Sequence, residues 1–353
     1  MKVLVMPGDG IGPEIMDETV KVLQALERHG VRFEWTHGLV GGAAYEAEGD
    51  PLPPSSQKLA KECDAILFGS VGDDRYEHLG DKRPGVGLMR LRKELDLFAN
   101  FRPVKMFDDL VGASTLQPQF VKGLDLLIVR ELTADLYYGK PRGIETDKNG
   151  KRFAYNTMPY HEDEVRRIAH VAFQTARTRS KKVCSVDKAN VLEAMMLWRE
   201  VVTEVSQEYP DVALSHMYVD AAGMALVRNP KQFDVMLTPN LFGDIMSDVA
   251  AMLSGSIGML PSASVRADTM GLFEPCHGSA PDIARQDKAN PIACILSGAM
   301  MLRHSFGLED AARRVEDAVR QTLKDGFRTG DIMQPGMKLV GTKAMGEAVT
   351  ARI

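Results

Sequence analysis

The chain has 353 residues, of which 44% are hydrophobic and 26% are charged, so it can bury a substantial core and is long enough to build two lobes. Its net charge of -5 at pH 7 argues against nucleic acid or an anionic membrane as a partner. No stretch is long and apolar enough for a transmembrane helix, and the apolar run before Pro7 is too short for the core of a signal peptide.

The cysteines lie far apart in the sequence and form no CxxC pair; they are Cys63, Cys184, Cys276 and Cys294. This usage is typical of isolated reduced thiols in a cytosol, and it disfavours a disulfide framework or a zinc site. We therefore expect a soluble cytoplasmic protein, and its size and composition favour an enzyme.

Short strand-like runs alternate with longer helical patterns from the beginning of the chain. The first helix is predicted over 13–30, opened by Pro13 and closed by Gly30, and a second is predicted over 54–63. The predicted strands cover residues 2–6, 31–38, 64–69, 123–131, 181–187, 212–220 and 233–240. This alternation predicts an α/β protein, and the polar residues that end several strands are expected to face a site.

A glycine-rich turn, PGDGIGPE at residues 7–14, follows the first predicted strand. It is not a GxGxxG motif, because its glycines fall at positions 8, 10 and 12 and Pro13 follows at once. A standard dinucleotide-binding Rossmann fold is therefore not predicted. By itself the turn is as compatible with a structural role as with ligand binding.

Residues 141–160 interrupt the alternation of helices and strands. Asp147, Asn149 and Gly150 form a turn signal between two strand-like arms, which predicts a projecting hairpin. An exposed apolar hairpin usually has a partner, so we expect this arm, about residues 139–160, to take part in dimerisation. A plain surface hairpin is the alternative.

Two aspartates, Asp244 and Asp248, lie four residues apart on one face of a predicted helix. Their like charges repel unless a cation joins them, and an oxygen-only site suits Mg²⁺ or Mn²⁺. The alternative is a helix face in water. Asp220, which we expect to end the strand over 212–220, is a candidate third ligand.

Three arginines lie near the ends of apolar segments. Arg92 is in a predicted helix, Arg102 follows an apolar strand and precedes Pro103, and Arg130 closes another strand. Guanidinium groups at such positions expect carboxylates, either of a ligand or of structural salt bridges. Tyr137 and Lys188 add a possible pair for proton transfer.

The stretch GLFEPCHGSAPDIARQDKANP, residues 271–291, concentrates polar side chains between three prolines. Pro275, Pro281 and Pro291 argue against a continuous helix or a central strand, so a long ordered loop is expected. Long polar loops in compact proteins are usually functional or disordered. Disorder is disfavoured here because residues 291–302 read as a buried helix.

Taken together, these segments resemble the isocitrate/isopropylmalate β-decarboxylating dehydrogenases over essentially the whole chain. The matching stretches are PGDGIGPE, LRKELDLFANFRPV, VRELTADLYYGKPRG, SVDKANVL, YVDAAGM, NLFGDIMSD, GSIGMLPSAS and GLFEPCHGSAPDIA. Their order matches that of the family. The resemblance implies two α/β lobes around an active-site cleft, with one lobe at 1–98 and 255–353 and the other at 99–254.

The resemblance also implies a reaction, an NAD-dependent oxidative decarboxylation of (2R,3S)-3-isopropylmalate to 4-methyl-2-oxopentanoate and CO₂ in leucine biosynthesis. Arg92, Arg102 and Arg130 would bind the malate moiety, and Asp244 and Asp248 would hold Mg²⁺ or Mn²⁺. Asp220 and Lys188 would come from the partner subunit of a homodimer with shared active sites. Asp220 would complete the metal and substrate site, Lys188 would assist removal of the hydroxyl proton, and Tyr137 would protonate the decarboxylated intermediate.

By the same resemblance, the loop at 271–291 would bind the adenosine half of the cofactor. The implied cofactor residues are Ile11, Glu274, His277, Gly278, Ser279, Ala280, Asp282, Ile283 and Asn290. Asp282 would accept hydrogen bonds from the ribose and repel a 2′-phosphate, which favours NAD over NADP. Leu88 and Met89, on the helix face that leads to Arg92, are apolar and suit an isopropyl group.

The chain departs from the family pattern at Gly85, where a glutamate is usual, at Ala134 and Tyr138, and at Arg285. None of these departures removes a catalytic group. Two alternatives stay open: a D-malate or tartrate dehydrogenase on the same scaffold, and a non-catalytic regulatory subunit. The regulatory alternative is disfavoured because the metal, base and acid residues are all present.

Overall fold

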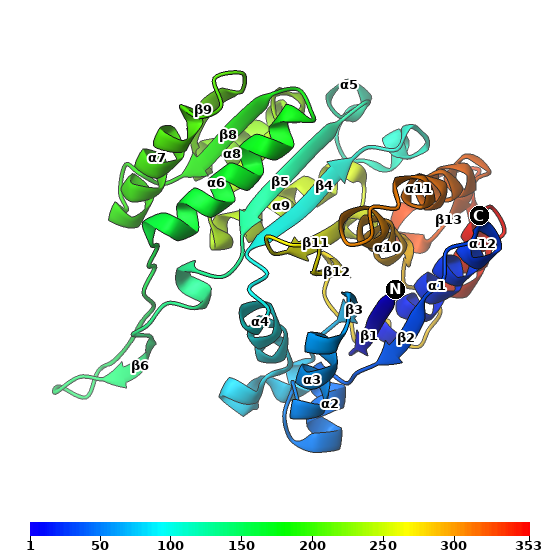
Figure 1. Ribbon diagram of the computed structural model, residues 1–353, viewed down its shortest axis with the longest axis horizontal. Coiled ribbons are helices and arrows are strands. Elements are labelled where there is room, and N and C mark those ends of the chain that lie inside the picture. The colour runs from blue at the N-terminus through cyan, green and yellow to red at the C-terminus, as the bar shows by residue number, and fades with distance from the viewer. The chain divides into compact units, whose positions relative to one another are not determined.

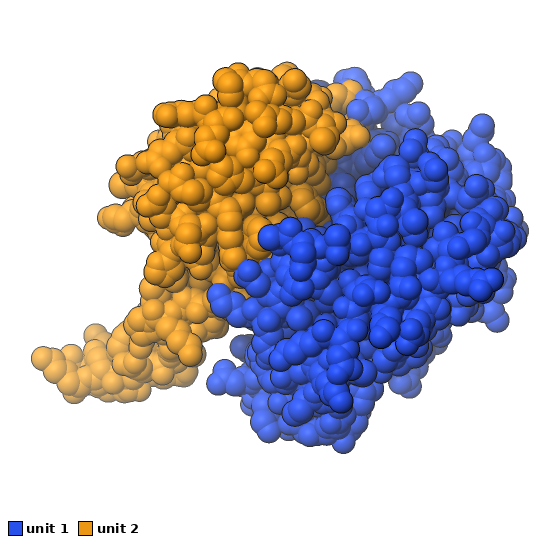
Figure 2. Space-filling view, in the orientation of Figure 1, with its two compact units in different colours: residues 1–97, 102–123, 251–353 blue, residues 98–101, 124–250 orange.

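The computed structural model describes residues 1–353, which form two compact units (Figures 1 and 2). Unit 1 comprises residues 1–97, 102–123 and 251–353, and unit 2 comprises residues 98–101 and 124–250. The chain changes unit within strand β4 (Ala99–Lys105). The division into functional lobes at 98/99 and 254/255 stays a prediction.

Unit 1 contains a mixed sheet in which the strands are ordered β2-β1-β3-β12-β11. The pairs β1–β2, β1–β3 and β3–β12 are parallel, and β11–β12 is antiparallel. The strands are β1 (Lys2–Gly8), β2 (Glu34–His37), β3 (Ala65–Ser70), β11 (Pro261–Val265) and β12 (Gly271–Pro275), with a separate pair, β13 (Phe327–Arg328) and β14 (Lys338–Leu339). The helices are α1 (Gly12–Gln24), α2 (Gly41–Glu48), α3 (Pro54–Glu62), α4 (Pro84–Glu94), α5 (Pro118–Val121), α10 (Ile292–His304), α11 (Glu309–Lys324) and α12 (Thr342–Thr350).

The core of unit 1 lies between this sheet and its helices. Every residue of β3 is buried, and so is α10 from Ile292 to Leu302, which confirms the buried helix predicted after the proline-rich stretch. A cluster of apolar side chains from β1, β3 and β12 packs against Ala60 of α3 and Leu91 of α4. Burial of this surface is the main favourable term that holds the unit together.

The predicted first helix has the expected ends but a different interior. The α-helix stops at Gln24, and residues 25–29 continue as a 3₁₀-helix. Gly30 then ends the segment in the left-handed conformation, with φ 85°, which glycine adopts at little steric cost.

The expectation of a loop throughout 271–291 is wrong for its first five residues. Residues 271–275 form β12, which lies between β3 and β11, so it is a central strand. Pro275 is tolerated because it is the last residue of the strand, opposite Pro261 at the beginning of β11. The irregular part of the stretch starts only after Pro275.

Unit 2 contains a parallel sheet of four strands in the order β5-β10-β8-β9. Its strands are β5 (Asp125–Glu131), β8 (Lys182–Asp187), β9 (Ala213–Tyr218) and β10 (Val235–Thr238). Its helices are α6 (Glu162–Arg177), α7 (Glu193–Ser206), α8 (Val219–Arg228) and α9 (Asn240–Ala251). Strands β5, β8 and β10 are almost wholly buried, and Trp198 of α7 and Phe173 of α6 are fully buried within the unit.

Three boundaries in the functional segments differ from those expected. Asp220 does not end a strand, because β9 stops at Tyr218 and Asp220 lies in the first turn of α8. Arg102 lies inside β4, since Pro103 is accommodated within that strand. The strand over 233–240 is shorter than expected, and Asn240 begins α9.

The hairpin predicted in the arm is confirmed. Strands β6 (Gly143–Thr146) and β7 (Arg152–Tyr155) pair antiparallel, and the hairpin extends away from the body of unit 2 (Figure 1). The Asp147 carboxylate accepts hydrogen bonds from the backbone N–H groups of Asn149 and Lys151, which stabilises the turn. Ile144 and Phe153 are 66% and 46% exposed, so the arm presents apolar surface.

Candidate active site

The parallel sheet of unit 2 brings several predicted site residues to one edge. Arg130, near the carboxyl end of β5, is in register with Thr238, the last residue of β10. Asn240, Lys188 and Asp220 each follow the end of a strand of the same sheet, namely β10, β8 and β9. Parallel strands all end on the same side, and this is where open α/β sheets bind ligands.

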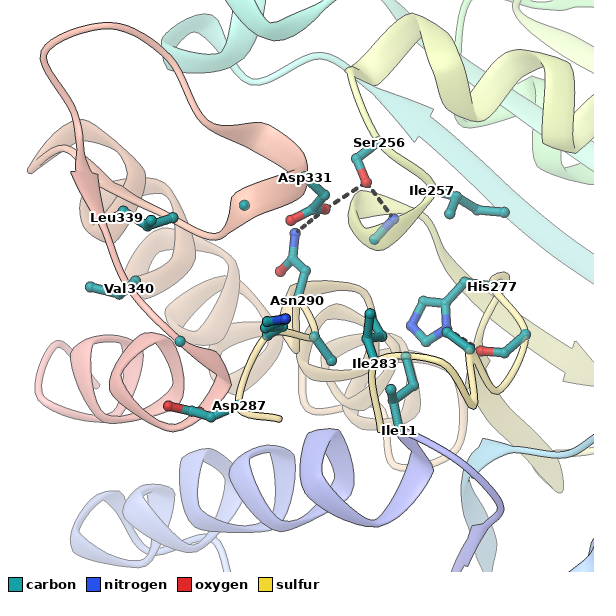
Figure 3. A pocket seen from close by; sticks show the side chains of 17 residues that line it. Ile11, Ser256, Ile257, His277, Ile283, Asp287, Asn290, Asp331, Leu339 and Val340 are labelled. Carbon is teal, nitrogen blue, oxygen red and sulfur yellow. Dashed lines mark hydrogen bonds between the residues drawn. The ribbon is translucent and has the colours of Figure 1, made fainter. Parts of the chain in front are cut away.

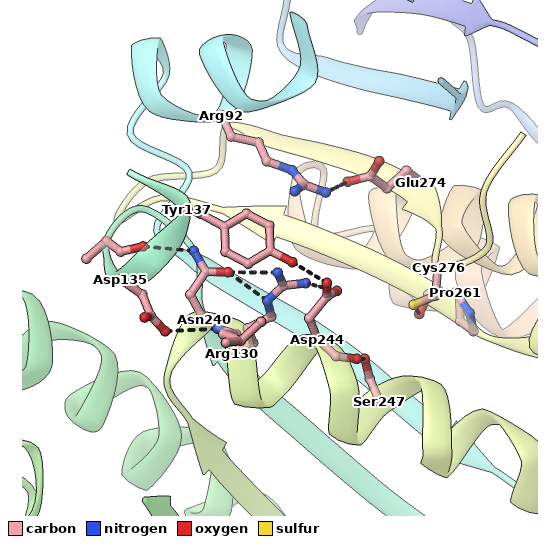
Figure 4. Close-up of polar contacts among 12 residues, drawn as sticks. Arg92, Arg130, Asp135, Tyr137, Asn240, Asp244, Ser247, Pro261, Glu274 and Cys276 are labelled. Atoms are coloured by element: carbon pink, nitrogen blue, oxygen red, sulfur yellow. Dashed lines mark hydrogen bonds and ion pairs between the residues drawn. The ribbon is translucent and has the colours of Figure 1, made fainter. Parts of the chain in front are cut away.

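Arg130, Tyr137 and Asp244 form a hydrogen-bonded cluster at that edge (Figure 4). Arg130 Nη1 donates to Asp244 Oδ1 at 2.6 Å, and the Tyr137 hydroxyl donates to Asp244 Oδ2. The guanidinium carbon of Arg130 lies 5.5 Å from the centroid of the Tyr137 ring, within the range of a cation–π contact. The side chain of Arg130 is 2% exposed and that of Asp244 is 35% exposed, so the cluster is buried behind and open at the carboxylate.

The two aspartates predicted as metal ligands lie one turn apart on α9. Asp244 is half-buried and Asp248 is exposed, and their carboxylate oxygens are the donors that Mg²⁺ and Mn²⁺ prefer. Within this single chain no group of three or more His, Cys, Asp or Glu side chains could hold a metal ion. Asp220 of the same chain is therefore not a third member of the pair. The donor chemistry fits a hard divalent cation that takes its remaining ligands from elsewhere.

Lys188 and Asp220 form an ion pair, with 2.9 Å between Lys188 Nζ and Asp220 Oδ1. This hydrogen bond with Lys188 holds the pKa of Asp220 below its usual value. The ring of Tyr218 lies near both Lys188 Nζ, at 5.7 Å, and the guanidinium of Arg199, at 4.9 Å. Arg199 in turn donates two hydrogen bonds to the fully buried Asp187, so the segment that carries Lys188 is held on both sides.

In unit 1, Arg92 of α4 pairs with Glu274 of β12 at 2.6 Å between Arg92 Nη2 and Glu274 Oε1 (Figure 4). Both side chains are nearly buried, at 11% and 7% exposure, and burial strengthens such a pair while raising the cost of removing one partner. Glu274, which we expected among the cofactor residues, thus contacts a predicted substrate arginine. Arg102 of β4 is buried, Leu88 packs on the apolar core of unit 1, and Met89 is half-buried.

A cavity of about 730 Å³ in unit 1 collects most of the predicted cofactor residues (Figure 3). Six of them line it: Ile11, His277, Gly278, Ala280, Ile283 and Asn290. Ser279 and Asp282 do not. Ser279 is buried and donates to the carbonyl oxygen of Gly72, and the side chain of Asp282 is exposed. The wall is mostly apolar, which is typical of small-molecule sites.

Several polar groups face this cavity, and His277 has an unsatisfied one. His277 Nδ1 lies 2.8 Å from the carbonyl oxygen of Gly278, whereas Nε2 is buried without a hydrogen-bond partner. Burial lowers the pKa of His277, so the ring is neutral at pH 7. A buried ring nitrogen without a partner fits a ligand that carries its own hydrogen-bonding groups, as a nucleotide does.

The glycine-rich turn and the cavity loop are in direct contact within unit 1. The N–H of Ile11 donates to the carbonyl oxygen of Ser279 at 2.8 Å. A Cβ on Gly10, whose φ is 57°, would lie 2.0 Å from that same oxygen, so only glycine permits this approach. The turn therefore has a structural role, and it also places Ile11 in the cavity wall.

Two parts of these sites were not predicted from the sequence. In the cavity, Asp331 accepts hydrogen bonds from Ser256 Oγ at 2.6 Å and from Asn290 Nδ2 at 3.0 Å (Figure 3). Its position in the sequence, far from the proline-rich stretch, carries no signal of this contact. In unit 2, Asn240 accepts two hydrogen bonds from Arg130, and the only available signal was its place directly after a buried strand.

Known proteins match this chain over nearly its whole length. The family model for isocitrate/isopropylmalate dehydrogenase matches residues 2–349. The chain belongs to the isocitrate/isopropylmalate dehydrogenase family. Its curated relatives include the 3-isopropylmalate dehydrogenases of Chromobacterium violaceum, 59% identical over 99% of both chains, and of Methylococcus capsulatus, 58% identical over 100% of this chain and 99% of the relative.

Two solved structures share the fold. The isocitrate dehydrogenase of Methylococcus capsulatus superposes with a TM-score of 0.88 at 38% identity, covering 99% of this chain and 98% of that chain. The TT0538 protein from Thermus thermophilus also gives a TM-score of 0.88, at 31% identity, over 99% of this chain and 68% of that one. The predicted α/β fold of this family is thereby confirmed, and the protein is a dehydrogenase of the isocitrate/isopropylmalate dehydrogenase family. No helix in the structure has the length and apolarity needed to cross a membrane.

Proposed function

We propose that the enzyme oxidises the C2 hydroxyl of (2R,3S)-3-isopropylmalate with NAD⁺ and releases the C3 carboxylate as CO₂, giving 4-methyl-2-oxopentanoate for leucine biosynthesis. The carrying observation is the Arg130–Tyr137–Asp244 cluster, in which a cation, a proton donor and a carboxylate converge at the edge of a parallel sheet. Full-length relatives named 3-isopropylmalate dehydrogenase support the choice of substrate.

The arginines would bind the two carboxylates of the substrate. Arg130 is rigidly held, and its guanidinium suits bidentate recognition of a carboxylate. Arg92 and Arg102 would add positive charge from unit 1, and Leu88 and Met89 would contact the isopropyl group. A methyl-scale difference in such a pocket is worth about 1–3 kcal/mol, so D-malate is the competitor to compare.

Proton transfer would use the other two groups. Lys188 would take the hydroxyl proton as a neutral amine, and the Asp220 carboxylate, 2.9 Å from Lys188 Nζ, would position the group. Tyr137 would deliver a proton to carbon after CO₂ has left, because its hydroxyl lies in the same cluster as the substrate-binding Arg130.

Asp244 and Asp248 would hold Mg²⁺ or Mn²⁺, with Asp220 supplied by the partner subunit. When bound, such an ion polarises the oxygen at C2 and stabilises the negative charge that decarboxylation leaves. NAD⁺, which accepts the hydride, would place its adenosine in the cavity lined by Ile11, His277 and Asn290. Asp282 and its neighbour Ile283 offer no positive charge to a 2′-phosphate, which supports NAD over NADP.

A homodimer would supply the shared groups, and exposed apolar side chains on unit 2 support it. Met224 and Val227 of α8 are 68% and 51% exposed, and Ile245 of α9 is 49% exposed. Together with the apolar arm, these exposed hydrophobic side chains suit a surface that a partner subunit covers. The cytoplasmic location expected from the sequence stays a prediction.

The decisive assay follows NADH formation from 3-isopropylmalate, with and without a chelator. We expect turnover that stops when divalent ions are removed and returns when Mg²⁺ or Mn²⁺ is added. Undiminished turnover in the chelated enzyme would contradict the metal-dependent mechanism. A higher kcat/KM for D-malate than for 3-isopropylmalate would reassign the substrate.

Sharing of sites is tested by mixing inactive Arg92→Ala and Lys188→Ala chains. If Lys188 acts in the partner's site, a heterodimer regains one intact site, and part of the activity returns. Absence of recovery after demonstrated subunit exchange would show that Lys188 acts within its own chain.

A further inference from the structure

Three buried polar side chains, Asn240, Tyr160 and Glu131, are connected to Arg130 by hydrogen bonds. The proposed reaction assigns no role to them. We infer that Asn240 is a positioning residue that sets the orientation of the Arg130 guanidinium toward the substrate, and that the buried Tyr160 and Glu131 hold Asn240 in place. This inference rests on the proposed function, because it assigns Arg130 to the substrate.

Asn240 holds one whole edge of the guanidinium. Its Oδ1 accepts from Arg130 Nε at 3.0 Å and from Nη2 at 2.7 Å, while Arg130 Nη1 donates to Asp244 (Figure 4). Two bonds to one acceptor on one side and one bond on the other side leave the planar group a single orientation. Asn240 is 1% exposed, so water does not compete for these bonds.

The amide of Asn240 can face in only one direction. Its Nδ2 donates to the carbonyl oxygen of Ala134 at 3.1 Å, an acceptor, whereas Arg130 offers only donors to Oδ1. Rotating the amide by 180° would break all three bonds. The side chain is therefore locked as well as buried.

Tyr160 and Glu131 support Asn240 from behind. The backbone N–H of Asn240 donates to the Tyr160 hydroxyl at 2.9 Å, and that hydroxyl donates to Glu131 Oε2 at 3.2 Å. Glu131 also accepts from the N–H and Oγ1 of Thr133 and from the N–H of Ala134, at 2.8 to 3.0 Å. Tyr160 is 8% exposed and Glu131 is fully buried, so both support Asn240 from within the core.

The backbone of α9 allows the arginine stem to lie against it. A Cβ on Gly243 would lie 2.7 Å from Arg130 Cγ and 2.2 Å from Thr238 Oγ1. Glycine at this position lets the helix that carries Asn240 and Asp244 approach β5 closely. Asn240 and Asp244 thus bind different nitrogens of the Arg130 guanidinium, and Gly243 leaves room for the aliphatic part of the same side chain.

The test measures kcat and both KM values for three variants. Asn240→Ala should raise the KM for 3-isopropylmalate about 10-fold or more, as expected for loss of hydrogen bonds to a charged group, while the KM for NAD⁺ changes less than about twofold. Asn240→Ser is the matched control, because serine keeps a small polar side chain at the first residue of α9 but lacks the carboxamide that binds Arg130. It should behave like Asn240→Ala, and full recovery by serine would show that the carboxamide is not needed and overturn the inference.

A double-mutant cycle separates positioning from general destabilisation. In an Arg130→Lys background the forked donor is gone, so Asn240→Ala should add less than about a threefold change in kcat/KM. Independent, multiplicative losses would overturn the inference.

If Asn240→Ala does not fold, Tyr160→Phe carries the test, since it keeps the buried ring and removes only the hydroxyl. Tyr160→Phe should raise the KM for 3-isopropylmalate alone, by about three- to 10-fold. An unchanged KM for that substrate, or equal changes in both KM values, would contradict the positioning role.

Activity of the wild-type enzyme distinguishes a failure of the proposed function from a failure of the positioning role of Asn240. If it forms no NADH from 3-isopropylmalate, the proposed function fails. If it does, and the KM for that substrate is the same in Asn240→Ala, the positioning role fails while the function stands.

Discussion

The proposed cofactor cavity of unit 1 and the polar edge of unit 2 are built on different physical principles. The cavity is walled by loops and mostly apolar groups, and its few polar atoms include the unsatisfied His277 Nε2. The edge of unit 2 is made of charged groups at strand ends, each bound to another group of the same chain. The cavity therefore suits a large, largely uncharged group such as adenosine. The edge of unit 2 suits a small dianion, because its charged groups are already oriented.

Substitutions in the two regions should therefore have different kinetic effects. Shape recognition spreads its free energy over many contacts, so the loss of one contact is modest. Pre-oriented charges act on the reacting atoms, so the loss of one group falls mainly on the rate. Three experiments on Tyr137 and His277 test this separation of roles.

Tyr137→Phe should give the largest effect. It keeps the ring beside Arg130 and removes the hydroxyl that we assign to proton delivery. We expect kcat to fall by about 10²- to 10⁴-fold, the usual range for loss of a general acid, with little change in the KM for NAD⁺. Steady-state kinetics with 3-isopropylmalate measure this. Tyr138→Phe, one residue further, is the control and should retain nearly wild-type rates; a Tyr137→Phe enzyme of normal kcat would remove Tyr137 from the chemistry.

His277→Phe should give an intermediate effect confined to the cofactor. The ring volume is kept, but the buried Nε2 that lacks a partner is lost. We expect the KM for NAD⁺ to rise about 10-fold at most, as for the loss of one or two hydrogen bonds, and the KM for 3-isopropylmalate to stay constant. Direct NAD⁺ titration by calorimetry checks the same change without catalysis. A fall in kcat larger than the change in NAD⁺ affinity would break the proposed separation of the two regions.

The smallest effect concerns stability and pH. Burial lowers the pKa of His277 in the folded protein, so the unfolded chain binds a proton at higher pH than the folded one. The stabilisation is fully present above the unfolded pKa of about 6.5 and is lost as the pH falls from there toward the folded pKa. The urea midpoint of the wild type should therefore drop more between pH 7.5 and pH 5.5 than that of His277→Phe. Parallel curves for the two proteins would show that His277 does not titrate differently on folding.

The candidate site was largely accessible from the sequence where chemistry and local periodicity coincide. The four-residue spacing of Asp244 and Asp248 indicates one helix face whatever the tertiary structure, and α9 has that face. The position of Arg130 at the end of an apolar run likewise indicated a strand end, and β5 ends at Glu131. The hairpin turn at Asp147 to Gly150 follows from local hydrogen bonding alone.

Local reasoning failed where partners from elsewhere in the chain decided the conformation. Residues 271–275 became a central strand despite Pro275, because β3 and β11 flank them and the proline falls on the final residue. Glu274, which the family resemblance places among the cofactor residues, also pairs with Arg92, 182 positions earlier. No periodicity in either segment encodes that pairing.

The sequence alone determined the family, the order of helices and strands, and the residue types available for the chemistry, since these depend on side-chain identity and on spacing within single elements. Only the tertiary structure decided which of those residues meet. The contacts of Asn240 with Arg130, of Asp331 with Asn290 and of Gly10 with Ser279 each join segments that are remote in the chain. Such contacts arise from the packing of whole elements against one another, and this information is distributed over the entire core.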